Sequence, residues 1–131
     1  MTREERLNNP LGIKRDGTLW AGMSPEQPDP VFVAFVDAPH GIRAAVKILE
    51  SYRDRDGIDT IAGAIYRWAP PEENDTVAYI ADVCDEMQCA QDYPLEPKSL
   101  PLVRAMIRHE NGPASLSIYT DPIIQQGIDL A

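Results

Sequence analysis

A double proline interrupts the chain within residues 68–76, which read Trp-Ala-Pro-Pro-Glu-Glu-Asn-Asp-Thr. Proline cannot continue a helix, and it pushes the residue before it out of the helical region. Asn74 and Asp75 can accept hydrogen bonds from the free N–H groups of a helix that follows. Because helical apolar patterns flank this segment on both sides, it predicts a sharp corner between two helices, packed on Trp68.

Two helices are predicted before this corner. Asp37 is a candidate N-cap for a helix that ends at Gly57, and a second helix begins after Asp59 or Thr60 and stops at Pro70. The first of them carries apolar residues at the spacing of one helical face. These are Ile42, Ala45, Val46, Leu49 and Tyr52.

Three further helices are predicted after the corner. One begins at Asn74 or Asp75, the next is capped by Ser99 and ends before Gly112, and the last is opened by Asp121 and weakened by Gly127. The first of the three is expected to bury the face formed by Val77, Ile80, Ala81, Cys84 and Met87. The last is short, covering residues 123–130.

The N-terminal part of the chain has a different character. Residues 1–30 are polar and rich in turn signals, which predicts a largely irregular segment pinned to the core by Trp20. Residues 31–36 are β-branched and aromatic, which predicts one short strand buried on both faces, with residues 12–20 as a hairpin partner. We therefore expect a mainly α (α+β) fold: one compact domain over residues 1–131, with four to five helices and a small N-terminal β element.

The composition excludes several classes of function. With a net charge of −9 and no basic run, the chain lacks the cations that nucleic-acid binding requires. There is no apolar run long enough to cross a membrane and no signal peptide at the N-terminus. Cys84 and Cys89 have a poor zinc spacing, and no phosphate loop, H-E-x-x-H or Cys-x-x-Cys motif occurs. We expect neither a metal nor a cofactor.

Carboxylates are the remaining candidates for chemistry. Glu5 could act as a general acid in sugar cleavage if apolar surroundings raised its pKa, although a solvated charge near the N-terminus is the plainer reading. Glu110 falls on the apolar face of its helix, next to His109, so partial burial is expected for it. Glu73 precedes a helix N-terminus, where an acidic residue is electrostatically favoured without any catalytic role. Trp20 and Trp68 suit either a sugar-stacking surface or the core.

Four segments of the chain resemble a group of small bacteriophage proteins. Residues 6–13 followed by 20–22 are similar to the opening pattern R-x-N-N-P-x-N-I … W-x-G of that group. Residues 32–52, the stretch from Thr60 to Tyr79 with its double proline, and residues 105–112 continue the resemblance over nearly the whole chain. The group is described as phage virion or structural proteins, some of them lysozyme-like proteins that lyse the cell wall.

The resemblance implies a virion-associated protein, made in the host cytoplasm and related to peptidoglycan-directed glycosidases of the lysozyme or lytic transglycosylase type. If the chain is an enzyme, Glu5 is expected to be the general acid and Glu110 or Glu73 the second carboxylate. Substrate contacts are then expected from Asn8, Asn9, Trp20, Trp68 and Asn74. The resemblance is compatible with a lysozyme-like fold and with an oligomer. It implies peptidoglycan or other virion proteins as the binding partners.

Two alternatives to an enzyme fit the same residues. The first is a non-catalytic structural or protein-binding module of the phage particle, in which Glu5 is exposed and the Trp68 corner is core. The second is a small host-directed phage protein that inhibits a cellular target, which the acidic composition allows but no motif supports.

Overall fold

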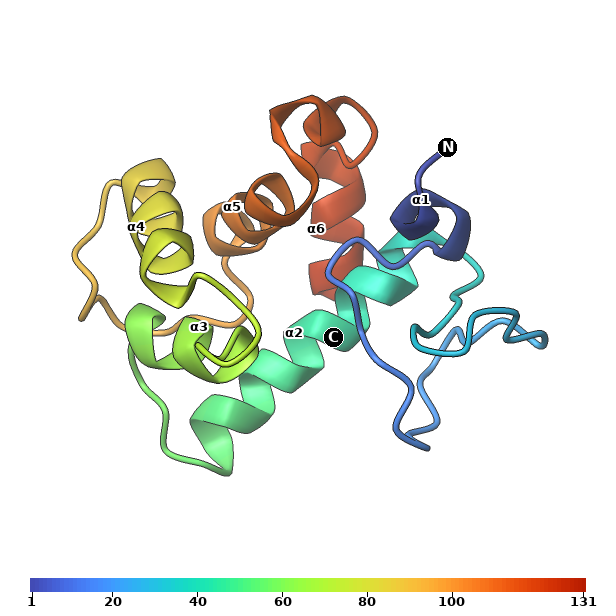
Figure 1. Ribbon diagram of the computed structural model, residues 1–131, viewed down its shortest axis with the longest axis horizontal. Helices are drawn as coiled ribbons and strands as arrows, with labels where there is room; N and C mark the ends of the chain where they lie inside the picture. The colour runs from blue at the N-terminus through green and yellow to red at the C-terminus, as the bar shows by residue number, and fades with distance from the viewer.

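The longest helix, α2 (Ala38–Asp54), runs diagonally across the fold in the computed structural model, which describes all of residues 1–131 (Figure 1). The carboxylate of Asp37 accepts a hydrogen bond from the backbone N–H of His40, which confirms Asp37 as the N-cap. Its buried face includes Ile42, Val46 and Leu49, none more than 1% exposed. The C-terminal helix α6 (Asp121–Leu130) packs along the same helix.

Helices α3 (Ile61–Trp68) and α4 (Thr76–Met87) meet at the predicted corner (Figure 1). The side chains of Thr60 and Asp75 cap their N-termini. Backbone N–H groups of residues 73 and 74 donate to the carbonyl of Pro70, and the Thr76 hydroxyl donates to the carbonyl of Ala69. The prolines end one helix, and these hydrogen bonds turn the chain into the next.

The buried face of α4 is one residue out of register with the predicted face. Val77, expected inside, is 79% exposed, whereas Tyr79 is only 3% exposed. The buried residues of this helix are Thr76, Tyr79, Ile80, Val83 and Cys84. The burial of Ile80 and Cys84 was predicted correctly, whereas Ala81 is exposed and Met87 is only half-buried. The helical period was therefore predicted correctly, but the buried face is shifted by one residue.

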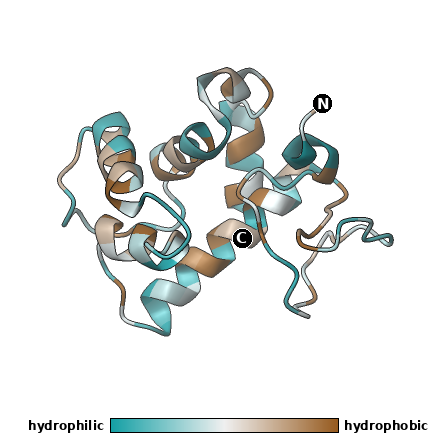
Figure 2. Cartoon of the chain, in the orientation of Figure 1, coloured by the Kyte–Doolittle hydropathy of each residue, from teal (hydrophilic) through white to brown (hydrophobic).

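Helix α5 (Leu100–Asn111) continues through a 3₁₀ turn, η1 (Pro113–Ser117), towards α6 (Figure 1). Ser99 caps α5 as predicted, whereas α6 begins after Thr120, one residue before the predicted cap. Met106 and Ile107 of α5 are fully buried in the single large core cluster. Figure 2 shows the apolar residues on the inward faces of the helices, with polar residues mainly on the outside.

The N-terminal segment contains one helix that was not predicted, α1 (Arg3–Leu7), and no strand. One isolated antiparallel bridge, Lys14 with Phe32, occurs where a hairpin was expected, and a second pairs Phe35 with Met23, which lies beyond the expected partner residues 12–20. The prediction of a strand buried on both faces is wrong, because residues 31 and 36 are 44% and 54% exposed. Only the middle of this stretch, including Val33 at 1% exposure, is buried.

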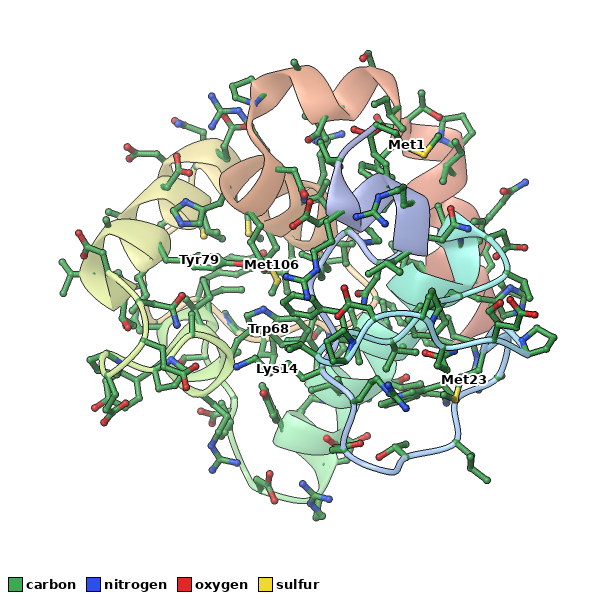
Figure 3. The ribbon with its side chains drawn as sticks, turned by 45° about the vertical axis from the view of Figure 1, so that its right-hand side comes forward. Met1, Lys14, Met23, Trp68, Tyr79 and Met106 are labelled. Carbon is green, nitrogen blue, oxygen red and sulfur yellow. The ribbon has the colours of Figure 1, made fainter.

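Polar and aromatic contacts tie the two ends of this segment together. The guanidinium of Arg3 makes two hydrogen bonds of 2.7 Å to the carboxylate of Asp29 and lies 4.5 Å from the centre of the Phe32 ring. The Arg3 guanidinium, together with backbone N–H groups, holds the pKa of Asp29 well below its usual range. Met23, from a loop of this segment, appears at one side of the molecule in Figure 3, well away from Trp68 and Tyr79.

The expected fold class is confirmed: the chain forms a compact helical domain with six α-helices and no sheet. The small β element is limited to isolated bridges. None of the helices is both long and apolar enough to cross a membrane.

Candidate functional site

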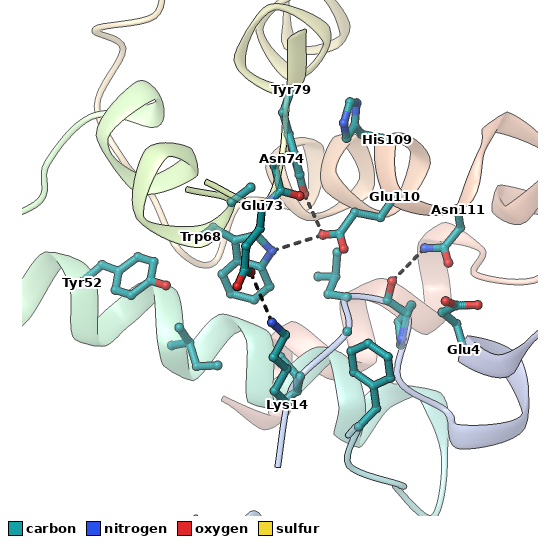
Figure 4. A pocket seen from close by; sticks show the side chains of 17 residues that line it. Glu4, Lys14, Tyr52, Trp68, Glu73, Asn74, Tyr79, His109, Glu110 and Asn111 are labelled. Carbon is teal, nitrogen blue, oxygen red and sulfur yellow. Dashed lines mark hydrogen bonds and ion pairs between the residues drawn. The ribbon is translucent and has the colours of Figure 1, made fainter. Parts of the chain in front are cut away.

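An open cavity of about 590 Å³ lies where the N-terminal segment faces the α3–α4 corner and the C-terminal end of α5 (Figure 4). Its walls come from five parts of the chain. These parts are residue 4 with residues 10–14 and 32, α2 at Ile48 and Tyr52, residues 68, 69, 73 and 74 at the end of α3 and in the corner, Tyr79 of α4, and residues 109–111 of α5.

Glu110 occupies the centre of this cavity (Figure 4). Its Oε2 atom accepts a hydrogen bond of 2.7 Å from the Tyr79 hydroxyl and another of 3.1 Å from Nε1 of Trp68. The Oε1 atom lies towards Gly12, where it would be 3.8 Å from a Cβ placed on that residue. One carboxyl oxygen is therefore fixed by two donors, and the other faces the opposite wall.

The surroundings of Glu110 raise its pKa to about 7. Water reaches the side chain through the mouth of the cavity, but protein atoms surround the carboxyl group on its other sides, and this desolvation is the largest cause. The hydrogen bonds from Tyr79 and Trp68 act in the opposite direction, and the charge of Glu4 raises the pKa further. Near neutral pH a substantial fraction of Glu110 therefore carries a proton, as a general acid requires.

Two other carboxylates line the same cavity. Glu73, at the corner, is exposed and pairs with Nζ of Lys14 at 3.3 Å, so this ion pair links the corner to the N-terminal segment (Figure 4). Glu4, on α1, lies near Asn111, whose side-chain amide donates to the carbonyl of Pro10 at 2.7 Å (Figure 4). The cavity thus contains one carboxyl group with a raised pKa, that of Glu110, and two further acidic side chains in its walls.

Aromatic rings form much of the remaining wall. Trp68 is half-buried and contacts the ring of Tyr52 edge-on, with 6.5 Å between ring centres. In the same wall, the ring of His109 lies 3.9 Å from that of Tyr79, and its Nδ1 atom is 2.7 Å from a carboxylate oxygen of Asp82. This packing fixes the tyrosine that donates to Glu110.

Four of the predicted site residues line the cavity: Glu73, Glu110, Trp68 and Asn74. Glu5, Asn8, Asn9 and Trp20 do not. Glu5 lies on α1 and accepts a hydrogen bond from the hydroxyl of Thr2. Trp20 packs against the core, away from the cavity.

The Asn-Asn pair of the N-terminal motif has a structural explanation. Asn8 adopts the left-handed conformation that ends α1, and its amide donates to the carbonyl of Phe35. Asn9 is 1% exposed and makes hydrogen bonds to both backbone groups of Ile13 and to the carbonyl of Val33. Both side chains hold the loop that forms one wall of the cavity.

Sequence reasoning missed Glu4, Lys14 and Tyr79 as site residues. The correct phase of α4 would have placed Tyr79 inside, and a buried tyrosine usually has a hydrogen-bond partner for its hydroxyl. No local signal distinguishes Glu4 from Glu5, because only the orientation of the unpredicted helix α1 decides which of them reaches the cavity.

We expect an NMR titration of the Glu110 carboxyl carbon to give a midpoint near pH 7, well above the usual value of 4.5. Tyr79→Phe should move this midpoint higher, because the lost hydrogen bond favours the ionised form. The contribution of Glu110 to stability should be complete below pH 4.5 and be lost as the pH rises through about 7, because the folded state binds the proton more tightly. A midpoint near 4.5 would show that water in the cavity solvates the carboxylate fully.

Comparison with known proteins identifies a bacteriophage relative. The chain is 39% identical over 128 residues to Protein P5 of Pseudoalteromonas phage PM2. The alignment covers 95% of this chain and 78% of that protein. No protein-family model matches the chain.

Proposed function

This chain belongs to the bacteriophage protein family of Protein P5 of Pseudoalteromonas phage PM2, and we propose that it is a virion-associated glycosidase acting on peptidoglycan. One observation carries the catalytic part of the proposal. Glu110 presents a protonatable carboxyl group at the centre of an open cavity, with one oxygen fixed by Tyr79 and Trp68. Phage particles must pass the bacterial cell wall, which gives such an activity a place in the life of the virus.

In the proposed reaction Glu110 is the general acid. Because Oε2 accepts two hydrogen bonds, the acidic proton resides on Oε1, the oxygen that faces the opposite wall. From there it can be transferred to the glycosidic oxygen as the bond to the leaving sugar breaks. Positive charge then develops on the sugar ring that remains.

A second carboxylate must stabilise this charge or activate a water molecule. Glu73 and Glu4 are the candidates, since both line the cavity. Glu73 pairs with Nζ of Lys14 at 3.3 Å, which links it to the N-terminal wall of the cavity. We propose Glu73 for this role and Trp68, Tyr52 and Asn74 for contacts with the sugar, because aromatic faces suit the C–H groups of a sugar ring.

A non-catalytic function requires a surface that can bind other proteins of the phage particle. A structural or protein-binding module of the particle uses exposed apolar side chains as contacts, and Leu19 and Val77 are 91% and 79% exposed. In that reading the Glu110 carboxyl group is a structural link between α3, α4 and α5.

The two readings are separated by incubating the purified protein with purified Gram-negative peptidoglycan and identifying soluble products by mass spectrometry. New reducing sugar ends indicate a hydrolase, and anhydro-muropeptides indicate a lytic transglycosylase. Absence of products at high protein concentration, with the fold verified by circular dichroism, supports the structural reading. Mass spectrometry of purified virions tests separately whether the protein is packaged.

A further inference from the structure

The C-terminal end of α4 places two free cysteines side by side. Gln88 has a positive φ of 52°, and its N–H donates to the carbonyl of Asp85 at 3.2 Å. The N–H of Cys89 donates to the carbonyl of Cys84 at 3.1 Å. These two hydrogen bonds around a left-handed residue define a Schellman motif, a turn that brings its first and sixth residues together and often places their side chains in contact. Those residues are Cys84 and Cys89, so the turn at the end of α4 brings the two cysteines close together.

The two thiols differ in their access to solvent. Cys84 is 8% exposed, whereas Cys89 is half-buried and lines a second cavity of about 320 Å³. Tyr93 and Ser99 line the same cavity, which is separate from the one that contains Glu110. A small reagent can therefore reach Cys89 first, while Cys84 is positioned behind it.

We propose that Cys84 and Cys89 form a redox-active pair that closes to an intramolecular disulfide on reaction with a small-molecule disulfide. The Cys89 thiolate attacks one sulfur of the oxidant, which forms a mixed disulfide and releases one thiol. Cys84 then loses its proton and attacks Sγ of Cys89, which releases the second thiol. Two protein thiols are oxidised and one disulfide molecule is reduced to two thiols, so the electrons balance.

Burial governs the rate of the second step. Desolvation raises the pKa of the Cys84 thiol to about 11, with a further contribution from Cys89. The resolving thiol is therefore rarely ionised near neutral pH, and closure should become faster as the pH rises.

The disulfide would connect α4 to a loop that already holds α3. Backbone N–H groups of Ile61 and Ala62 donate to the carbonyls of Tyr93 and Gln91 in that loop. Closing the bond therefore ties the end of α4 to the start of α3. These are the two helices that supply the hydrogen-bond donors to Glu110, so the pair is placed to stabilise this half of the molecule in an oxidising environment.

The test is to equilibrate the full chain with oxidised glutathione and to measure intact mass and thermal unfolding. We expect a mass loss of about 2 Da, reversed by dithiothreitol, and a rise in Tm on the order of 5 °C. Cys89→Ser is the matched control and should show neither change. A stable glutathione adduct, a disulfide-linked dimer, or an unchanged mass in the wild-type protein would each overturn the proposal, and none of these readouts depends on glycosidase activity.

Discussion

Replacement of Glu110 by glutamine should lower the rate of peptidoglycan cleavage by about a thousandfold, the usual contribution of a general acid. Glutamine has the shape of glutamate and can accept the hydrogen bonds from Tyr79 and Trp68 through its amide oxygen. It cannot donate an acidic proton to the leaving sugar. The substitution therefore removes the chemistry and keeps the packing, so the Tm should change little.

Two further variants make this experiment decisive. Glu72→Gln removes an exposed carboxylate from the same corner but outside the cavity, and should leave the rate unchanged. Glu5→Gln tests the general acid expected from sequence, which lies on α1 outside the cavity. If Glu5→Gln were inactive while Glu110→Gln kept its activity, the acid would be Glu5 and the cavity around Glu110 would not be the catalytic site.

The pH dependence of the proposed peptidoglycan cleavage by the wild-type protein tests the same group independently. With the pKa of Glu110 at about 7, activity should fall as the pH rises above neutral, because the acid loses its proton. Tyr79→Phe should move this alkaline limb to higher pH, in parallel with the NMR midpoint. An alkaline limb that does not respond to this substitution would belong to another group.

Local signals were sufficient to predict most helices. Asp37 and Ser99 were identified as N-caps from residue type and position, and the other two caps, Thr60 and Asp75, were each one of two neighbouring candidates; all four make the expected hydrogen bond. Such caps act over three residues of sequence, so they can be read without knowledge of the tertiary structure. The face of α4 that is buried could not be predicted in this way. Whether Val77 or Tyr79 points inwards depends on the side chains of the neighbouring helices against which α4 packs.

The candidate site was only partly predictable for the same reason. Glu110, Glu73 and Trp68 were singled out, but their meeting requires α3, α5 and the corner to pack together. The N-terminal motif was read as a set of substrate contacts, whereas the amide groups of Asn8 and Asn9 bind backbone carbonyls. A polar motif can serve either to bind a substrate or to fix the conformation of a loop. The burial of the polar side chains distinguishes these two roles.

Gly127 illustrates how tertiary contact can reverse a local rule. Glycine weakens an isolated helix, and substitution by alanine in a helix interior normally stabilises it by about 1 kcal/mol. In α6, however, a Cβ on Gly127 would lie 2.5 Å from Cγ2 and 2.6 Å from Cβ of Ile42, and 2.8 Å from the carbonyl oxygen of Pro39. These atoms belong to α2, so glycine allows the two helices to approach closely.

Gly127→Ala should therefore destabilise the protein by about 2 kcal/mol after the helix-propensity gain is included, because the added methyl group forces α6 away from α2. Urea unfolding monitored by circular dichroism would measure the loss, and the Tm should fall on the order of 8 °C. Gln126→Ala, at an exposed position of the same helix, is the matched control and should change stability by less than about 0.5 kcal/mol. A gain in stability for Gly127→Ala would mean that α6 can shift along α2 without loss of packing, and that helix propensity outweighs the close contact.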